Sequence, residues 1–306
     1  MSASAQRTTA AVRPAARALP ALIELTKPRI VLLVLFTGLP ALLLAKGAMP
    51  SGRVFWGAIA GIALSAASGA AFNHYFDRDL DGLMVRTRQR PLPSGQLAPA
   101  AAAAFGLMLA WASWVVLCIA CNPMSAVIAM CSIFYYAVVY TVWLKRRTPQ
   151  NIVIGGGAGA SAPLIAWAAV TGTIGLPAVL LSAIVFLWTP PHFWSLALYR
   201  REDYERAGIP MLPVTHGEPE TRKRILLYTL VLVPVTLLLL PLGAVGLVYA
   251  IPAAGLGAIF IVEAWRLWKS GQIARAPALF RFSILYLFAL YSLLAVDALL
   301  RGATRA

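Results

Sequence analysis

Nine long apolar runs decide what this chain can fold into. An α-helix of about 20 residues crosses the hydrocarbon core of a bilayer, and most of the runs are close to that length. With 60% hydrophobic and only 12% charged residues, the 306-residue chain holds more apolar surface than one water-soluble core can bury. We therefore predict an all-α polytopic membrane bundle of nine transmembrane helices. The predicted spans are residues 30–45, 54–76, 98–120, 123–143, 150–171, 175–198, 225–245, 247–265 and 278–300.

The basic residues between these runs are unevenly distributed. Of the 26 lysines and arginines, 22 fall in segments on one side of the predicted membrane, and only Lys46, Arg53, Arg301 and Arg305 fall on the other. Because basic loops remain in the cytoplasm, we predict a cytoplasmic N-terminus and a C-terminus on the far side. The net charge of +15 is then mostly a topological signal with some attraction to anionic lipid, and it implies no nucleic-acid partner.

The chain is predicted to contain a cytoplasmic N-terminal tail, residues 1–28, and a single transmembrane domain, residues 29–306. The tail is rich in Ala and Arg with Glu24 as its only acid, which is also typical of mitochondrial transit peptides. Because so little chain precedes the first span, we favour a bacterial inner-membrane protein over a mitochondrial one.

The densest chemistry follows the second apolar run, where Asn73, Asp77 and Asp81 recur every four residues. If the helix continues to Gly82, each step advances only about 40° around its axis, so one amide and two carboxylates share a face. Asp79 falls on another face. An all-oxygen surface suits Mg²⁺, which keeps waters and phosphate oxygens as its remaining ligands. The sequence therefore predicts a site for Mg²⁺ and a polyphosphate.

Basic residues accompany the aspartates on the same predicted membrane face. Arg86 and Arg90 follow them directly, and Lys145 and Arg146 end the fourth apolar run. Guanidinium and ammonium groups bind phosphate oxygens. Taken alone, Lys145 and Arg146 are better explained as anchors that snorkel to the interface, but their position beside the aspartates favours a role in binding.

Prolines predict where helices begin or break. The segment around Lys27 and Pro28 is interpreted as a helix start rather than as a substrate contact. Pro163 is expected to kink the fifth run, whereas Pro190 and Pro191 remove two backbone donors and are expected to break the sixth.

A second acidic cluster follows the sixth run. Asp203 lies beside Glu202 and four residues after Tyr199, so it would supply a second carboxylate site facing the first across the bundle. Solvated loop charge is the alternative interpretation of this cluster.

Several motifs together resemble the UbiA superfamily of intramembrane prenyltransferases, and most closely its haem-farnesylating branch. The match covers about residues 25–217, and the chain departs from the family pattern at Ala162 and Ala166. The motifs are Asn73-x-x-x-Asp77-x-x-x-Asp81, Met84-x-Arg86-Thr87-x-x-Arg90-Pro91, Lys145-Arg146-x-Thr148-x-x-Asn151, the stretch from Gly155 to Pro163, Trp188-Thr189-Pro190-Pro191-His192-Phe193-Trp194, and Asp203-Tyr204-x-x-x-Gly208-Ile209-Pro210-Met211-x-Pro213.

The resemblance implies a nine-helix bundle around a central cavity that is open to lipid. It also implies transfer of a farnesyl group from farnesyl diphosphate to a vinyl group of haem B, giving haem O. Haem A synthase and oxidase assembly proteins are the protein partners to which such an activity points. The implied Mg²⁺ ligands are Asn73, Asp77 and Asp81, with Asp203 for a second ion, and Lys145 joins these four as a catalytic residue. The implied substrate-binding residues are Arg86, Arg90, Arg146, Tyr199 and His192.

His192 is the residue most informative about the acceptor. Followed by Phe193 and Trp194, it would bind a planar macrocycle by stacking and by a ring nitrogen. The alternative is a histidine that satisfies carbonyls freed by Pro190 and Pro191, and the sequence favours neither.

Rival functions remain open at this point. A prenyltransferase with a quinone precursor or another aromatic acceptor would carry the same donor site. A cation-coupled transporter would place its acids near the membrane midplane in repeat-related broken helices, whereas these acids lie at one face. A non-catalytic haem-binding protein would need His192 but not the aspartates.

Overall fold

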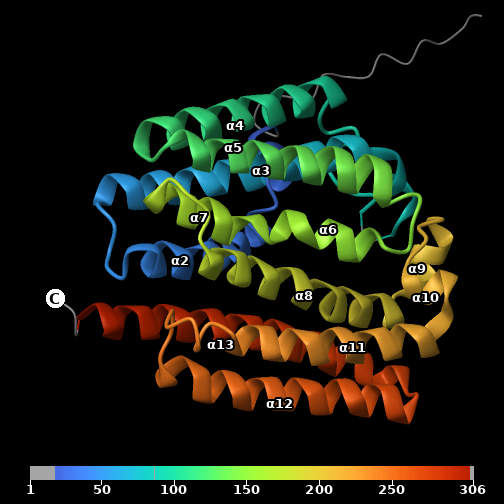
Figure 1. The fold of residues 1–306 in the computed structure, drawn as a ribbon. Helices are drawn as coiled ribbons and strands as arrows, with labels where there is room; N and C mark the ends of the chain where they lie inside the picture. Colours follow the sequence, from blue (N-terminus) through green and yellow to red (C-terminus); the bar gives the residue numbers. More distant parts are fainter. Residues whose placement is uncertain (1–17, 86, 304–306) are drawn as a thin grey trace, which may run out of the picture.

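The computed structural model describes residues 18–85 and 87–303, and within these ranges it is a bundle of helices without strands (Figure 1). The all-α prediction is therefore confirmed. The elements are α1 (Ala18–Leu25), α2 (Pro28–Lys46), α3 (Gly52–Leu83), α4 (Pro99–Ala120), α5 (Pro123–Phe134), η2 (Tyr135–Leu144), α6 (Asn151–Gly159), α7 (Ser161–Thr171), α8 (Leu176–Tyr199), α9 (Arg201–Arg206), α10 (Leu212–Thr215), α11 (Gly217–Leu237), α12 (Leu247–Ser270), η3 (Ile273–Arg275) and α13 (Ala276–Ala303).

Eight helical segments of the described chain are long and apolar enough to cross a membrane. They are α1 with α2, α3, α4, α5 with η2, α6 with α7, α8, α12, and η3 with α13. The protein is thus a multi-pass membrane protein. The predicted tail, residues 1–28, includes α1, which packs on α3 and α4.

The predicted span at residues 225–245 corresponds to α11, whose bounds differ from the prediction. The helix begins eight residues earlier, at Gly217, and its first turns carry Glu218 and Glu220 followed by three basic residues. It ends at Leu237, before Pro241 and before Gly243, whose φ of 66° turns the chain. The charged first turns explain why α11 does not meet the composition of a spanning helix.

Prolines act differently in the fifth and sixth runs. The fifth is interrupted at Ala160, between α6 and α7, so that Pro163 falls in the first turn of α7, as expected for a kink. The predicted break in the sixth run is wrong, because α8 continues through Pro190 and Pro191 to Tyr199. Packing of α8 against α6, α7, α11 and α13 holds the helix together despite the missing backbone donors.

Small residues let α3 lie close to its neighbours. A Cβ added to Gly57 or Gly61 would collide with Ala120 or Leu117 of α4. In a membrane, helix contact depends on such close backbone approach because lipid tails are as apolar as side chains. The α3–α4 contact fixes the helix that carries the aspartates.

The loops gather at the two ends of the bundle. In Figure 1, α9 and α10 cover one end, and the last turn of α13 lies at the other. The cytoplasm-facing segments predicted from charge, which include the end of α3 and the turn after η2, meet at the α9 end. The candidate site lies there.

Candidate active site

The last turns of α3 bury three polar side chains on one side of the helix. Asn73, Asp77 and Asp81 are all at most 4% exposed. Asn73 Nδ2 donates to Asp77 Oδ2 at 2.7 Å and to Thr141 Oγ1 of η2 at 3.1 Å. The shared face predicted from their spacing is therefore present.

Each of these three side chains contacts a basic side chain from a different segment. Lys27 Nζ donates to Asn73 Oδ1 at 2.5 Å, and Lys145 Nζ lies 2.5 Å from Asp77 Oδ2. Arg90 NH1 lies 2.8 Å from both oxygens of Asp81. Buried carboxylates need such partners, because an isolated buried charge is strongly destabilising. The α1–α2 junction, the loop after α3 and the end of η2 thus converge on one site.

The sequence analysis does not predict Lys27 as a site residue. Its φ of 50° makes it the only non-glycine residue with positive φ in the described ranges, a conformation that costs about 1 kcal/mol or more. This backbone turn ends α1, starts α2 and directs the ammonium group to Asn73. The feature of the sequence that could have indicated this role is that Lys27 lies on the same predicted membrane face as the aspartates.

Asp79 and Arg146 form a separate pair. The Arg146 guanidinium donates to both oxygens of Asp79 at 2.7 Å and to the Phe76 carbonyl at 2.8 Å. Its hydrogen bonds with Asp79 raise the pKa of Arg146 above its ordinary value. Both side chains are solvent-accessible, so this pair ties α3 to the turn after η2 and lies outside the buried cluster.

A cavity of about 540 Å³ opens from the buried cluster into the bundle. Its polar end is lined by Lys27, Asn73, Asp81, Arg90 and Lys145. The rest of its wall is predominantly apolar, with contributions from α2, α3, α5, η2, α6, α7, α8 and α13. Its size and its combination of one charged end with apolar walls are typical of a site for an amphiphilic ligand.

Two stacked tyrosines form part of the cavity wall. Tyr136 and Tyr140 lie 5.6 Å apart between ring centroids with an interplanar angle of 7°, on the π-helical segment η2. A Cβ on Gly69 would come within 2.9 Å of Tyr136, and one on Gly155 would overlap Tyr140. The glycines of α3 and α6 therefore make room for these rings.

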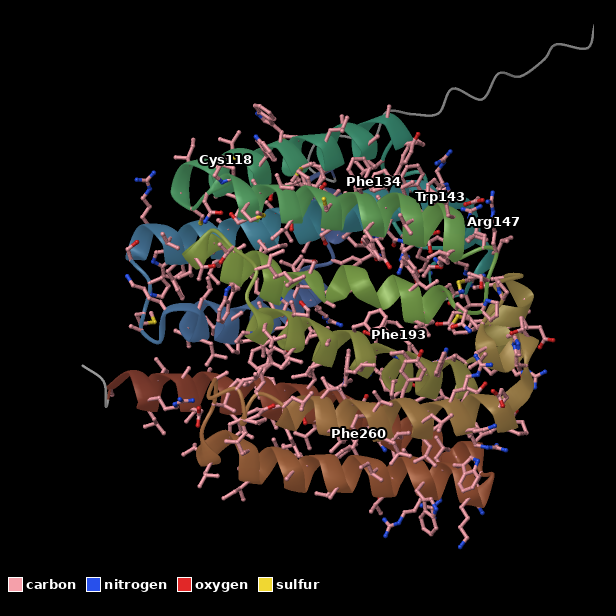
Figure 2. The ribbon with its side chains drawn as sticks, in the orientation of Figure 1. Cys118, Phe134, Trp143, Arg147, Phe193 and Phe260 are labelled. Carbon is pink, nitrogen blue, oxygen red and sulfur yellow. The ribbon has the colours of Figure 1, made fainter. Side chains whose placement is uncertain are left out.

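His192 also lines the cavity and lies in an aromatic stack. Its ring is 4.2 Å from Trp188 and 4.5 Å from Phe280 between centroids, at interplanar angles of 18° and 23°. Its Nδ1 lies 2.7 Å from Ser283 Oγ, so its partner is a hydroxyl of α13 and not a carbonyl freed by the prolines. Phe193 also lines the cavity, and Figure 2 shows it near the middle of the bundle.

Other predicted site residues lie elsewhere. Tyr199 packs edge-on against Phe280, at 6.1 Å between ring centroids. Asp203 accepts a hydrogen bond from Arg206 at 2.8 Å, and neither Tyr199 nor Asp203 is among the described residues that line the cavity. Arg86 lies outside the described residues.

The donor set of the buried cluster fits a hard divalent cation. Asp77 is not among the described residues that line the cavity, but its Oδ1 is buried and has no hydrogen-bond partner among the described residues, so this oxygen has unused capacity to accept a ligand. No group of three or more His, Cys, Asp or Glu residues converges in the parts of the chain that the structure describes, so any ion here would depend on the Asn73 amide and on substrate oxygens. These residues thus suit a cation that arrives with a phosphate group.

Comparison with known proteins places this geometry in a family. The model of the UbiA prenyltransferase family matches residues 34–293. The chain belongs to the UbiA prenyltransferase family. It is 50% identical over 284 residues to a protoheme IX farnesyltransferase of Azorhizobium caulinodans, covering 92% of each chain. It is 47% identical over 286 residues to a protoheme IX farnesyltransferase of Granulibacter bethesdensis, covering 90% of this chain and 89% of the other.

Solved structures of the UbiA family share the fold. A digeranylgeranylglyceryl phosphate synthase superposes with a TM-score of 0.79 at 20% identity, covering 92% of this chain and 98% of the other. A UbiA homologue from Archaeoglobus fulgidus, bound to DMAPP and Mg²⁺, superposes with a TM-score of 0.63 at 18% identity, covering 89% and 99%. At these identities the likeness establishes the helical fold.

Proposed function

We propose that the protein is an intramembrane prenyltransferase that moves the farnesyl group of farnesyl diphosphate to a vinyl group of haem B, giving haem O. The observation that carries this proposal is one cavity with a charged, carboxylate-containing end and a long apolar wall. The protoheme IX farnesyltransferases that resemble this chain over most of its length support the choice of substrates.

The charged end is the proposed diphosphate site. Asn73, Asp77 and Asp81 would hold Mg²⁺, which when bound neutralises the diphosphate and makes it a better leaving group. Lys27, Arg90 and Lys145 already line this end and would move from Asn73, Asp81 and Asp77, respectively, to phosphate oxygens as the donor enters. Donors fixed around the leaving group favour cleavage of its bond to the farnesyl carbon.

Two predicted residues need rearrangement to join this site. For Asp203 to hold a second ion, its carboxylate must leave Arg206. For Arg146 to bind the diphosphate, its guanidinium must leave Asp79. We retain both as proposals, together with Arg86 and Tyr199.

The apolar wall would hold the farnesyl chain and keep water from the allylic cation until the vinyl group attacks. As the carbon–oxygen bond of the donor breaks, a carbon–carbon bond forms to the vinyl group. The resulting cation takes up hydroxide from one water molecule, which releases a proton. Tyr136 and Tyr140 present aromatic surface to the cavity and are suited to stabilise positive charge.

The product of a direct assay tests this proposal. Membranes containing the protein are incubated with Mg²⁺, farnesyl diphosphate and haem B, and the pigments are analysed by mass spectrometry. We expect a haem that carries one hydroxyethylfarnesyl group, and none from membranes without the protein. A prenylated product from an aromatic quinone precursor, but not from haem, would assign a different acceptor. No product from either acceptor would contradict the transferase proposal.

We further propose nine spans in a bacterial inner membrane, with the N-terminus and the α9 end in the cytoplasm. This proposal is supported by the charge distribution and by the position of the last turn of α13 at the end opposite α9 (Figure 1). It counts α11 as a span, because this helix packs against both α8 and α12.

Single cysteines test the topology in a background whose three cysteines are replaced by alanine. Glu205, Ser51 and Ala303 are exposed and lie at loops or helix ends. Glu205→Cys should react with an impermeant maleimide only in inside-out vesicles, and Ser51→Cys and Ala303→Cys only in right-side-out vesicles. Labelling of Ala303→Cys from the cytoplasmic side would rule out nine spans.

A further inference from the structure

Ser283 of α13 is hydrogen-bonded to His192 and to two aromatic residues around it. Its Oγ lies 2.7 Å from His192 Nδ1 and 2.7 Å from the Phe280 carbonyl oxygen. Its own backbone carbonyl accepts a hydrogen bond from Trp188 Nε1 at 2.7 Å. Trp188 and Phe280 each stack on His192, and all three residues are thus hydrogen-bonded to one fully buried serine.

The hydroxyl of Ser283 has two polar neighbours but only one proton, so it can donate to only one of them. Two oxygen atoms 2.7 Å apart repel each other unless a proton lies between them, so the Ser283 hydroxyl donates to the Phe280 carbonyl. A serine bonded to the carbonyl three or four residues earlier is common in helices. The oxygen that remains can only accept, and its neighbour is His192 Nδ1. Nδ1 must therefore carry the proton of the imidazole.

We infer that Ser283 fixes His192 in its Nδ1-protonated form, so that Nε2 presents an unprotonated lone pair to the cavity as an axial ligand for the iron of a haem. The inference rests on the proposed function for the identity of the ligand. His192 lines the cavity, and Nε2 has no hydrogen bond with any described residue. A neutral imidazole nitrogen whose partner nitrogen is held by a hydrogen bond is the usual form of a metal-ligating histidine.

The stack also decides how a macrocycle can approach. Trp188 covers one face of the His192 ring, Phe280 packs in a near-parallel arrangement at 4.5 Å, and Phe193 lies edge-on at 5.2 Å. A porphyrin therefore cannot stack on either face of the His192 ring. The ring edge remains, and Nε2 is the atom on that edge that binds iron.

Nitrogen NMR of the whole protein in detergent or lipid tests the proton assignment without any activity measurement. The chain has only three histidines, so ¹⁵N-histidine labelling gives few signals, and His192→Gln identifies the relevant pair. We expect His192 with Nδ1 protonated and Nε2 bare. Ser283→Ala should shift the population toward the other tautomer, and Ser283→Thr should preserve it. Nε2 protonated in the unmodified protein would overturn the inference.

Titration with ferric haem B tests the ligand assignment. Ser283→Ala should weaken haem binding by about 10- to 100-fold and change the Soret band, as expected when the partner of a ligating histidine is lost. Ser283→Thr should bind normally. Ser195→Ala is the matched control, because Ser195 is a buried hydroxyl on α8 bonded to the Pro191 carbonyl at 2.6 Å. An unchanged haem spectrum in Ser283→Ala, or an equal loss in Ser195→Ala, would refute the ligand role.

The outcomes separate this inference from the proposed function. If the unmodified protein makes farnesylated haem but its haem spectrum does not depend on His192, the transferase stands and the ligand role fails. If haem is neither bound nor modified while NMR finds Nδ1 protonated, the acceptor assignment fails and the tautomer assignment stands. If Ser283→Ala does not fold, the NMR result for the unmodified protein and the haem titration of Ser283→Thr still decide the matter.

Discussion

Asp77→Asn is expected to lower the kcat/KM of prenyl transfer by about a hundred- to a thousandfold, the cost of losing one charged group at a preorganised site. The substitution keeps the size of the side chain but removes its charge. Asp77 is fully buried, contacts Lys145 through one oxygen, and leaves the other oxygen without a partner in the described residues. The measurement is farnesyl haem formation in membranes containing equal amounts of protein.

Asp79→Asn is the matched control for this prediction. Asp79 is two residues away, but its side chain is 60% exposed and is paired with Arg146 rather than with the buried cluster. Surface pairs of this kind contribute little, so activity should change less than about threefold. Near-normal turnover of Asp77→Asn at saturating Mg²⁺ would contradict the metal assignment, and an equally severe loss in Asp79→Asn would contradict the helical face.

Lys27→Met is expected to reduce kcat/KM for farnesyl diphosphate by about a hundredfold, or roughly 2.7 kcal/mol, within the range found when one member of a buried polar pair is removed. Lys27 is the cation that reaches Asn73 from the start of α2. Without its ammonium group, the diphosphate would lose one of three cations at the cavity end. Initial rates at varied donor concentration give the value.

Lys46→Met provides the comparison for Lys27, because Lys46 ends the same helix at the other end of the bundle. It should leave donor kinetics unchanged, and Lys27→Arg should retain much of the activity because it keeps the charge. If Lys27→Met and Lys46→Met behave alike, Lys27 has no part in donor binding and only shapes the helix junction.

The aspartate site was the most predictable part of the molecule. Helical periodicity alone places Asn73, Asp77 and Asp81 on one face, and the structure has them buried together. The nine apolar runs likewise predicted the helices, although only eight segments within the described residues have the composition of a spanning helix. The bounds of α11 were not predicted. Its start at Gly217, which includes the charged first turns, and its early end at Leu237 depend on local turn geometry that hydrophobicity does not report.

Tertiary contacts explain what could not be predicted. The αL conformation of Lys27 has no sequence signature, since lysine rarely adopts it. The continuity of α8 through Pro190 and Pro191 depends on the helices around it. Ser283 lies 91 residues from His192, and a serine within an apolar run gives no indication of its partner. In each case the decisive contact joins distant parts of the chain.

The two walls of the cavity are made by different parts of the chain, which bears on how the protein is synthesised. Every pair at the charged end, from Lys27 to Lys145, belongs to the first half of the sequence. The aromatic wall is complete only when α13, the last helix, inserts and delivers Phe280 and Ser283 to His192. A nascent chain therefore acquires the charged end of the cavity before the aromatic wall, and premature termination before α13 leaves the first without the second.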